Sequence, residues 1–260
     1  MLSFFHNFIL ETGRSTIAFL TFIGRIKIFG VTTIFTLFRP PYHWRQFSRQ
    51  MMDIGYYSLP VVGLTALFTG MVLALQSYTG FSRFSAEGAV ATVVVLSITR
   101  ELAPVLAGLM VAGRVGAAMA AEIGTMRVTE QIDALTTLST NPLKYLVAPR
   151  IISALIMLPC LVLVADVIGI MGGYIVSIYK LDFNASIYIH QTIQYLEVRD
   201  VVLGLVKAAT FGMIIALMGC FYGYYSKGGA QGVGSATTNA VVSASILILI
   251  TNYILTALFF

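Results

Sequence analysis

Five long apolar stretches restrict this chain to a membrane fold. They cover residues 54–77, 89–120, 147–178, 201–225 and 236–260. A helix needs roughly 20 mostly apolar residues to cross a bilayer, and each stretch has that length. Only 10% of the residues are charged, compared with roughly 25% in soluble domains. The sequence therefore predicts an all-α integral membrane protein, with five transmembrane helices in one domain over residues 53–260.

The N-terminal segment, residues 1–52, differs from these stretches and is expected to form an interfacial amphipathic helix. Phenylalanine and isoleucine are interleaved there with cations such as Arg25 and Lys27. Such a helix lies in the headgroup region with its basic side outward, and Arg39-Pro40-Pro41 would end it. The alternative is a first true span, which would hold Arg25 and Lys27 inside the hydrocarbon, where cations are costly.

The distribution of lysine and arginine predicts the orientation of the chain. With the N-terminus inside, ten cations fall on the cytoplasmic side: Arg14, Arg25, Lys27, Arg39, Arg45, Arg49, Arg127, Lys144, Arg150 and Lys227. Three fall outside: Arg83, Lys180 and Arg199. Because cytoplasmic segments carry an excess of cations, we expect the N-terminus in the cytoplasm and the C-terminus outside. An odd number of spans argues against an internal two-fold repeat within one chain. The alternative is that a dimer supplies the two-fold symmetry.

Arg100 and Glu101 stand about 12 residues into the second apolar stretch, near the middle of the bilayer. Neighbouring residues on a helix do not face each other, so these two are not expected to pair. Pro104 cannot donate to the carbonyl of Arg100, which favours a kink. Intramembrane charges indicate a cavity wall or a partner interface, and the alternative is a structural pair satisfied by neighbouring helices.

Small residues recur every four positions along the rest of the second stretch. They are Gly108, Ala112, Gly116, Ala120 and Gly124. This spacing lets helix backbones approach closely, and so it predicts a tightly packed interface without naming the partner.

Asp166 in the third stretch and Lys207 in the fourth are the other charges expected inside the membrane. Charges at this depth usually pair with each other. We expect a salt bridge between them that joins the third and fourth spans.

The longest polar connection, residues 121–146, separates the second and third spans on the cytoplasmic side. It carries charges of both signs in an amphipathic pattern. A short helix there could dock on a soluble protein, and the alternative is an ordinary interfacial loop.

Several motifs that would indicate enzyme or channel chemistry are missing from the sequence. There is no GxxxxGK[ST] phosphate loop and no HExxH, and the histidines His6, His43 and His190 are scattered. There is also no carbonyl selectivity filter of the TVGYG type. We expect no catalytic residue, no metal, no cofactor and no nucleic-acid partner.

Four sequence motifs give the chain a resemblance to the MlaE (YrbE-like) permeases over residues 50–260. They are GMVLALQSY, LSITRELAPVLAGLMVAGRVGAAMAAEIGTMRVTEQIDAL, NPLKYLVAPR and GAQGVGSATTNAVV. The resemblance implies the permease subunit of an ABC transporter that moves phospholipids between the inner and outer membranes and maintains outer-membrane lipid asymmetry. It implies a homodimer in the bacterial inner membrane with a periplasmic C-terminus. The implied partners are a cytoplasmic ATPase that binds the ATP, an MCE-domain substrate-binding protein and, in many systems, a small STAS-domain subunit.

The same resemblance implies roles for particular residues. The segment from Glu122 onward would be the coupling helix that seats on the ATPase, through Glu122, Arg127, Glu130 and Gln131. The substrate cavity would lie between two copies, lined by the first, second and fifth spans, with Leu73, Gln76, Tyr78, Arg100 and Glu101 in its wall. The alternatives are the same architecture carrying a sterol or fatty acid, and a membrane scaffold that transports nothing.

Overall fold

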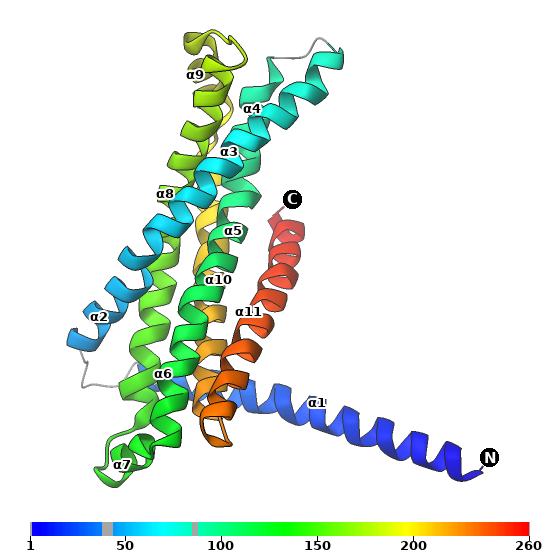
Figure 1. Cartoon of the computed structure of the whole chain (residues 1–260), viewed down its shortest axis with the longest axis vertical. Helices are drawn as coiled ribbons and strands as arrows, with labels where there is room; N and C mark the ends of the chain where they lie inside the picture. Colours follow the sequence, from blue (N-terminus) through cyan, green and yellow to red (C-terminus); the bar gives the residue numbers. More distant parts are fainter. Residues whose placement is uncertain (1, 38–43, 85–87, 260) are drawn as a thin grey trace.

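The described part of the computed structural model, residues 2–37, 44–84 and 88–259, is entirely helical apart from short turns (Figure 1). Six stretches within it are long and apolar enough to cross a membrane: Leu10–Thr36, Trp44–Phe81, Ala89–Val128, Leu143–Tyr179, Val198–Tyr224 and Gly229–Phe259. The membrane character predicted from the sequence is therefore confirmed. The count by length and composition is one higher than the five predicted, because the N-terminal helix also qualifies.

The N-terminal part consists of α1 (Leu2–Leu37), α2 (Trp44–Ile54) and the short η1 (Tyr56–Ser58). Figure 1 shows α1 running across the direction of the bundle, away from it, at the end where α6 and α7 lie. Its contacts with the bundle include aromatic pairs: Phe22 and Phe29 pack edge-on against Phe221, with ring centroids 5.8 and 5.6 Å apart. The expected stop at Arg39-Pro40-Pro41 lies outside the described residues.

The second apolar stretch is one long rod interrupted by two wide helical turns. Its elements are α4 (Ala89–Ser97), η3 (Ile98–Leu102), α5 (Ala103–Val111), η4 (Ala112–Gly116) and α6 (Ala117–Val128). Both η3 and η4 are π-helical, so each turn holds more residues than an α-helical turn. Such turns are frequent at functional sites.

Three further long helices pack together in the bundle: α3 (Leu59–Phe81), α8 (Ala148–Tyr179) and α10 (Val198–Tyr224). They cross at glycines. A methyl group on Gly70 of α3 would overlap the carbonyl oxygen of Gly169 on α8, and one on Gly212 of α10 would overlap the carbonyl oxygen of Ala154. Glycine is therefore required at these two positions, because any larger side chain would keep the helices apart at the crossing.

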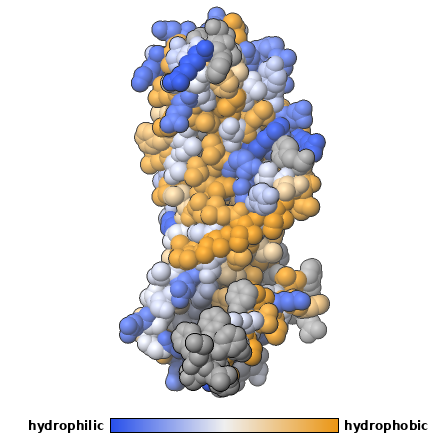
Figure 2. All heavy atoms as spheres, turned by 90° about the vertical axis from the view of Figure 1, so that its right-hand side faces the viewer, coloured by the Kyte–Doolittle hydropathy of each residue, from blue (hydrophilic) through white to orange (hydrophobic). Residues whose placement is uncertain are grey.

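The last long helix, α11 (Gly229–Phe259), begins seven residues before the predicted fifth span at 236. The glycine-rich stretch 229–234 is thus helical. The positive φ values of Gly228 and Gly229 mark the turn that leads into this helix. Figure 2 shows hydrophobic residues over much of the middle of one face and hydrophilic residues gathered at its upper end.

Short elements occupy the two ends of the bundle in Figure 1. At one end, α7 (Gln131–Thr137) and η5 (Leu143–Val147) connect α6 to α8. At the other end lie η2 (Ser82–Phe84) and α9 (Ala185–Tyr195), whose first turn is capped by the Asn184 side chain. The short helix α7 lies inside the polar segment 121–146.

Candidate functional site

A cluster of charged and polar side chains lies inside the bundle where η3, α10 and α11 meet. Arg100 Nε donates to Asp200 Oδ1 over 2.8 Å, and Lys207 Nζ donates to Glu101 Oε1 over 2.6 Å. Adjacent Arg100 and Glu101 thus form ion pairs with two residues of α10. These two ion pairs join the second span to α10.

The geometry of η3 follows from Pro104 and from the residue that compensates for it. Proline has no amide hydrogen, so it cannot serve the Arg100 carbonyl one helical turn before it. Lys207 Nζ donates to that carbonyl over 3.0 Å, and it also donates to Thr256 Oγ1 of α11 over 2.8 Å. One buried ammonium therefore satisfies a backbone acceptor, a carboxylate and a hydroxyl on two helices.

Glu101 links the cluster to α11. Its Oε2 accepts a hydrogen bond from Asn252 Nδ2 over 2.9 Å, and its Oε1 lies 2.9 Å from the Thr256 hydroxyl. Asn252 and Thr256 are one turn apart, so both face the carboxylate from the same side of α11.

The two halves of the cluster differ in exposure. The side chains of Arg100 and Glu101 are 32% and 37% exposed, whereas those of Asp200 and Lys207 are each 2% exposed. A cation and an anion thus face outward from η3, and their counter-charges are buried behind them. Such a surface can bind a molecule that carries charge of either sign or both.

The predicted salt bridge between Asp166 and Lys207 is wrong. Lys207 points to η3 and α11, where Glu101 holds it. Asp166 is buried in α8, and its Oδ1 has no hydrogen-bond partner among the described residues.

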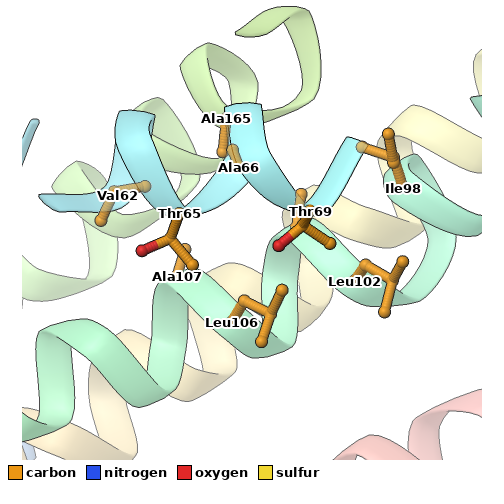
Figure 3. A pocket seen from close by; sticks show the side chains of 10 residues that line it. Val62, Thr65, Ala66, Thr69, Ile98, Leu102, Leu106, Ala107 and Ala165 are labelled. Carbon is orange, nitrogen blue, oxygen red and sulfur yellow. The ribbon is translucent and has the colours of Figure 1, made fainter. Parts of the chain in front are cut away.

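An apolar pocket lies beside η3, between α3 and α5 (Figure 3). Val62, Thr65, Ala66 and Thr69 of α3 line it, together with Ile98, Leu102, Ala103, Leu106, Ala107 and Ala165. Its volume is about 10 Å³, room for about one water molecule. The pocket is therefore a shallow apolar surface beside Glu101, with Ile98 before it and Leu102 after it in the chain, and it is too small to enclose a ligand.

The cavity candidates on α3 make other contacts. Leu73 packs against the hydrophobic core, and the Tyr78 ring packs edge-on against Phe183 at 5.7 Å. Gln76 lines a separate open hollow of about 440 Å³ with Thr79 and Arg83. Of the five residues assigned to a cavity wall, the structure brings only Arg100 and Glu101 into the polar cluster.

The residues assigned to coupling lie around the end of α6 and the start of α7. Arg127 Nη1 pairs with Asp133 Oδ1 over 2.7 Å on the surface. Glu130, at φ 58°, and Gln131 are exposed at the turn into α7. Glu122 instead pairs with the buried Arg150 of α8 over 2.7 Å.

The ladder of small residues faces α10 and α11 of the same chain. A methyl group on Gly108 would lie 3.3 Å from Phe211, and one on Gly124 would lie 3.3 Å from Val233. Conversely, a methyl group on Gly219 of α10 would lie 2.9 Å from the carbonyl oxygen of Gly116. Ala112 and Ala120 are buried as well.

Sequence reasoning missed Asp200, Asn252, Thr256 and the burial of Arg150. Asp200 lies three residues after Glu197, in a capping box that begins α10. Asn252 and Thr256 show the four-residue spacing of one helix face within an apolar run. These signals concern uncharged or helix-end residues, whereas the sequence analysis followed charges in mid-span.

Within the described ranges, no group of three histidine, cysteine, aspartate or glutamate residues could hold a metal ion. The ionised side chains of the cluster are paired with one another.

Comparison with known proteins finds a matching family model and several similar proteins. The family model described as Permease MlaE matches residues 47–258. A probable ABC transporter permease protein of Rickettsia bellii is 62% identical over 254 residues, covering 98% of each chain. One of Synechocystis is 44% identical, covering 83% of this chain and 82% of the relative. The chloroplastic protein TRIGALACTOSYLDIACYLGLYCEROL 1 of Arabidopsis thaliana is 34% identical, covering 90% of this chain and 67% of the relative.

Proposed function

Since this chain belongs to the MlaE permease family and is an ABC transporter permease subunit, we propose that it moves phospholipids between the inner and outer membranes. The energy comes from a partner ATPase, because an ABC permease works with one and carries no catalytic site of its own. The role would be the maintenance of lipid asymmetry in the outer membrane.

The observation that carries the proposal is the partly exposed pair Arg100 and Glu101 beside an apolar surface. A phospholipid has a charged headgroup joined to apolar tails. The Arg100 guanidinium suits a phosphate, Glu101 suits a headgroup ammonium, and Leu102 and Leu106 of the adjoining pocket suit an acyl chain. The name of the Arabidopsis relative refers to a glycerolipid, which supports a lipid here as well.

The complete cavity would need a second copy of the chain. In one copy the pocket beside η3 is shallow, while α3 and α11 carry outward-facing apolar residues such as Leu64, Phe68, Ile246 and Leu249. A homodimer that brings these faces together would enclose the outward side of the cluster. Leu73, Gln76 and Tyr78 would contribute to its wall only through such an assembly.

The cytoplasmic end would be the one that carries α7. Seven of the ten cations assigned to the cytoplasm are in α1, α2 and the α6–η5 region within the described residues: Arg14, Arg25, Lys27, Arg45, Arg49, Arg127 and Lys144. In this orientation α1 lies along the inner surface of the bacterial inner membrane, and the C-terminus is periplasmic. An MCE-domain protein would receive or deliver lipid at the other end, and a STAS-domain subunit would bind on the cytoplasmic side.

The proposed mechanism runs from α7 to the polar cluster. The ATPase grips the exposed Arg127, Glu130 and Gln131, and its closure shifts α6 and the rod above it. Because η3 is joined to α10 by two ion pairs, a shift of the rod changes how Arg100 and Glu101 face the cavity. The lipid headgroup is then bound or released according to the state of the ATPase.

Reconstitution with the ATPase and the MCE protein tests the function. Vesicles that contain a fluorescent phospholipid should lose or gain it on addition of ATP, and Arg100→Ala should lower this rate at least tenfold. Unchanged transport by Arg100→Ala would remove Arg100 from the lipid path. Sterol or fatty acid bound to the purified complex in place of phospholipid would favour the alternative cargo, and no ATP-driven movement of any lipid would favour a scaffold.

A further inference from the structure

The base of the bundle contains an ion pair that the proposed function does not use. Glu122 Oε2 on α6 lies 2.7 Å from Arg150 Nη2 on α8. Arg150 Nη1 also donates to the Leu146 carbonyl of η5 over 2.6 Å. The pair therefore closes the loop that starts in α6, passes through α7 and η5, and returns in α8.

The burial of the pair is unequal. The Arg150 side chain is 5% exposed, whereas that of Glu122 is 52% exposed. Arg150 Nε has no hydrogen-bond partner among the described residues, so Glu122 is the only carboxylate seen to neutralise this buried cation. A buried guanidinium that loses its counter-ion is strongly disfavoured, so the two helices are held together at this point.

The loop needs such a closure because its other connections can bend. The chain leaves α7 through Asn141-Pro142, which cannot continue a regular helix, and enters α8 through the π-helical η5. Without the ion pair, α6 and α8 would be joined by this loop and by their separate packing on α10, and a force on α7 would be absorbed in part at these points.

We propose that the Glu122–Arg150 ion pair makes α6 and α8 move as one body, so that a push on α7 reaches the second and third spans together. Glu122 is then a positioning residue that acts through Arg150 and does not touch the ATPase. This inference rests on the proposed function, because it assigns the pair to the path from the ATPase to the lipid.

The first test measures lipid moved per ATP hydrolysed in vesicles that hold a fluorescent phospholipid and the complete complex. Glu122→Gln should lower this ratio about tenfold, the size of effect that residues along a coupling path can have. The affinity for the ATPase should stay at the wild-type value, since the residues proposed to grip it are unchanged. Lys180→Gln, at the opposite end of α8, is the control and should leave both quantities unchanged.

Restoration of the pair separates positioning from a merely structural role. The exchange Glu122→Arg with Arg150→Glu should recover the ratio. If that variant does not fold, Glu122→Cys with Arg150→Cys, in a Cys160→Ala and Cys220→Ala background, replaces it. Joining the two thiols with a short bifunctional reagent should then raise the ratio relative to the same protein before reaction.

A second readout does not depend on lipid transport. Spin labels at the exposed Thr125 of α6 and Leu155 of α8 should report one distance with and without ATP in the wild type, and a broadened distribution in Glu122→Gln. A wild-type distance that changes on addition of ATP would overturn the inference, as would weakened ATPase binding or a wild-type ratio in Glu122→Gln. Failure of the proposed function itself would appear in the wild type, as no ATP-driven movement of the fluorescent phospholipid.

Discussion

The two partners of the Lys207–Glu101 ion pair should respond unequally to removal. Lys207 is almost fully buried, and without Glu101 its ammonium keeps two uncharged acceptors among the described residues, the Arg100 carbonyl and the Thr256 hydroxyl. Removing one partner of a buried pair costs about 3–5 kcal/mol. Because Lys207 keeps two hydrogen-bond acceptors, the lower value applies, and Glu101→Leu should cost about 3 kcal/mol.

The reverse change should be milder. Lys207→Met leaves the Glu101 carboxylate with Asn252 and the Thr256 hydroxyl as donors and with an exposed side, and it fills a similar volume. The change also removes the Lys207 donor from the Arg100 carbonyl, so its cost should be about 1 kcal/mol, the lower end of the range for a buried acceptor that loses a donor. The double variant, Glu101→Leu with Lys207→Met, leaves no unpaired charge in this ion pair and should be more stable than Glu101→Leu alone.

The assay is unfolding of the detergent-solubilised protein with increasing sodium dodecyl sulfate, followed by helical circular dichroism. The expected difference of about 2 kcal/mol between the single variants is about 30-fold in the unfolding constant. Lys180→Met, which changes an exposed cation, is the control and should stay within about 0.5 kcal/mol of wild type. The reasoning is refuted if Lys207→Met costs as much as Glu101→Leu, or if the double variant costs the sum of the two.

Two further predictions concern α7 and the helix crossings. Glu130→Lys should abolish stimulation of the ATPase while the permease stays folded, because the residue is exposed at the turn into α7; normal stimulation would contradict the docking assignment. Gly70→Ala should prevent stable folding, because its methyl group would overlap the Gly169 carbonyl, whereas Gly116→Ala should be tolerated, since its methyl group would lie 3.5 Å from Ile215. Thermal unfolding of the Gly70→Ala and Gly116→Ala variants checks these two expectations, and equal effects would show that α3 and α8 can separate. Gly116→Leu, which adds a branched side chain at the same position, should be destabilising.

Much of the architecture could be predicted because hydrophobic length and glycine spacing are local properties of the sequence. The long apolar helices and the embedded Arg100 and Glu101 follow from them. The helix that holds the fifth predicted span begins at Gly229, before the predicted bound at 236, because the glycine-rich sequence ahead of the apolar run is helical as well. A protein that packs helices closely in lipid can use glycine inside helices.

The pairing of charges could not be predicted, because it depends on the rotation and height of one helix relative to another. Asp166 and Lys207 are mid-span charges of opposite sign on consecutive spans, so the sequence predicts that they pair. Lys207 instead donates to the Arg100 carbonyl, which Pro104 cannot serve, and to the Glu101 carboxylate. Asp200 was overlooked because it stands at a helix start, where an acidic residue has a capping role.

The π-helical turns η3 and η4 divide the second span into three α-helical segments, α4, α5 and α6, whose side chains are rotated relative to one another about the helix axis. Each residue of an α-helix advances by about 100°, and a turn with an extra residue shifts everything beyond it by about that angle. A helical wheel drawn through residues 89–128 would therefore put α4 and α6 on the wrong faces. Deleting one residue from η3 would convert it to a regular turn and rotate α4 relative to α5. Arg100 or Glu101 would then lose its partner on α10 although every side chain of the cluster remained in the protein.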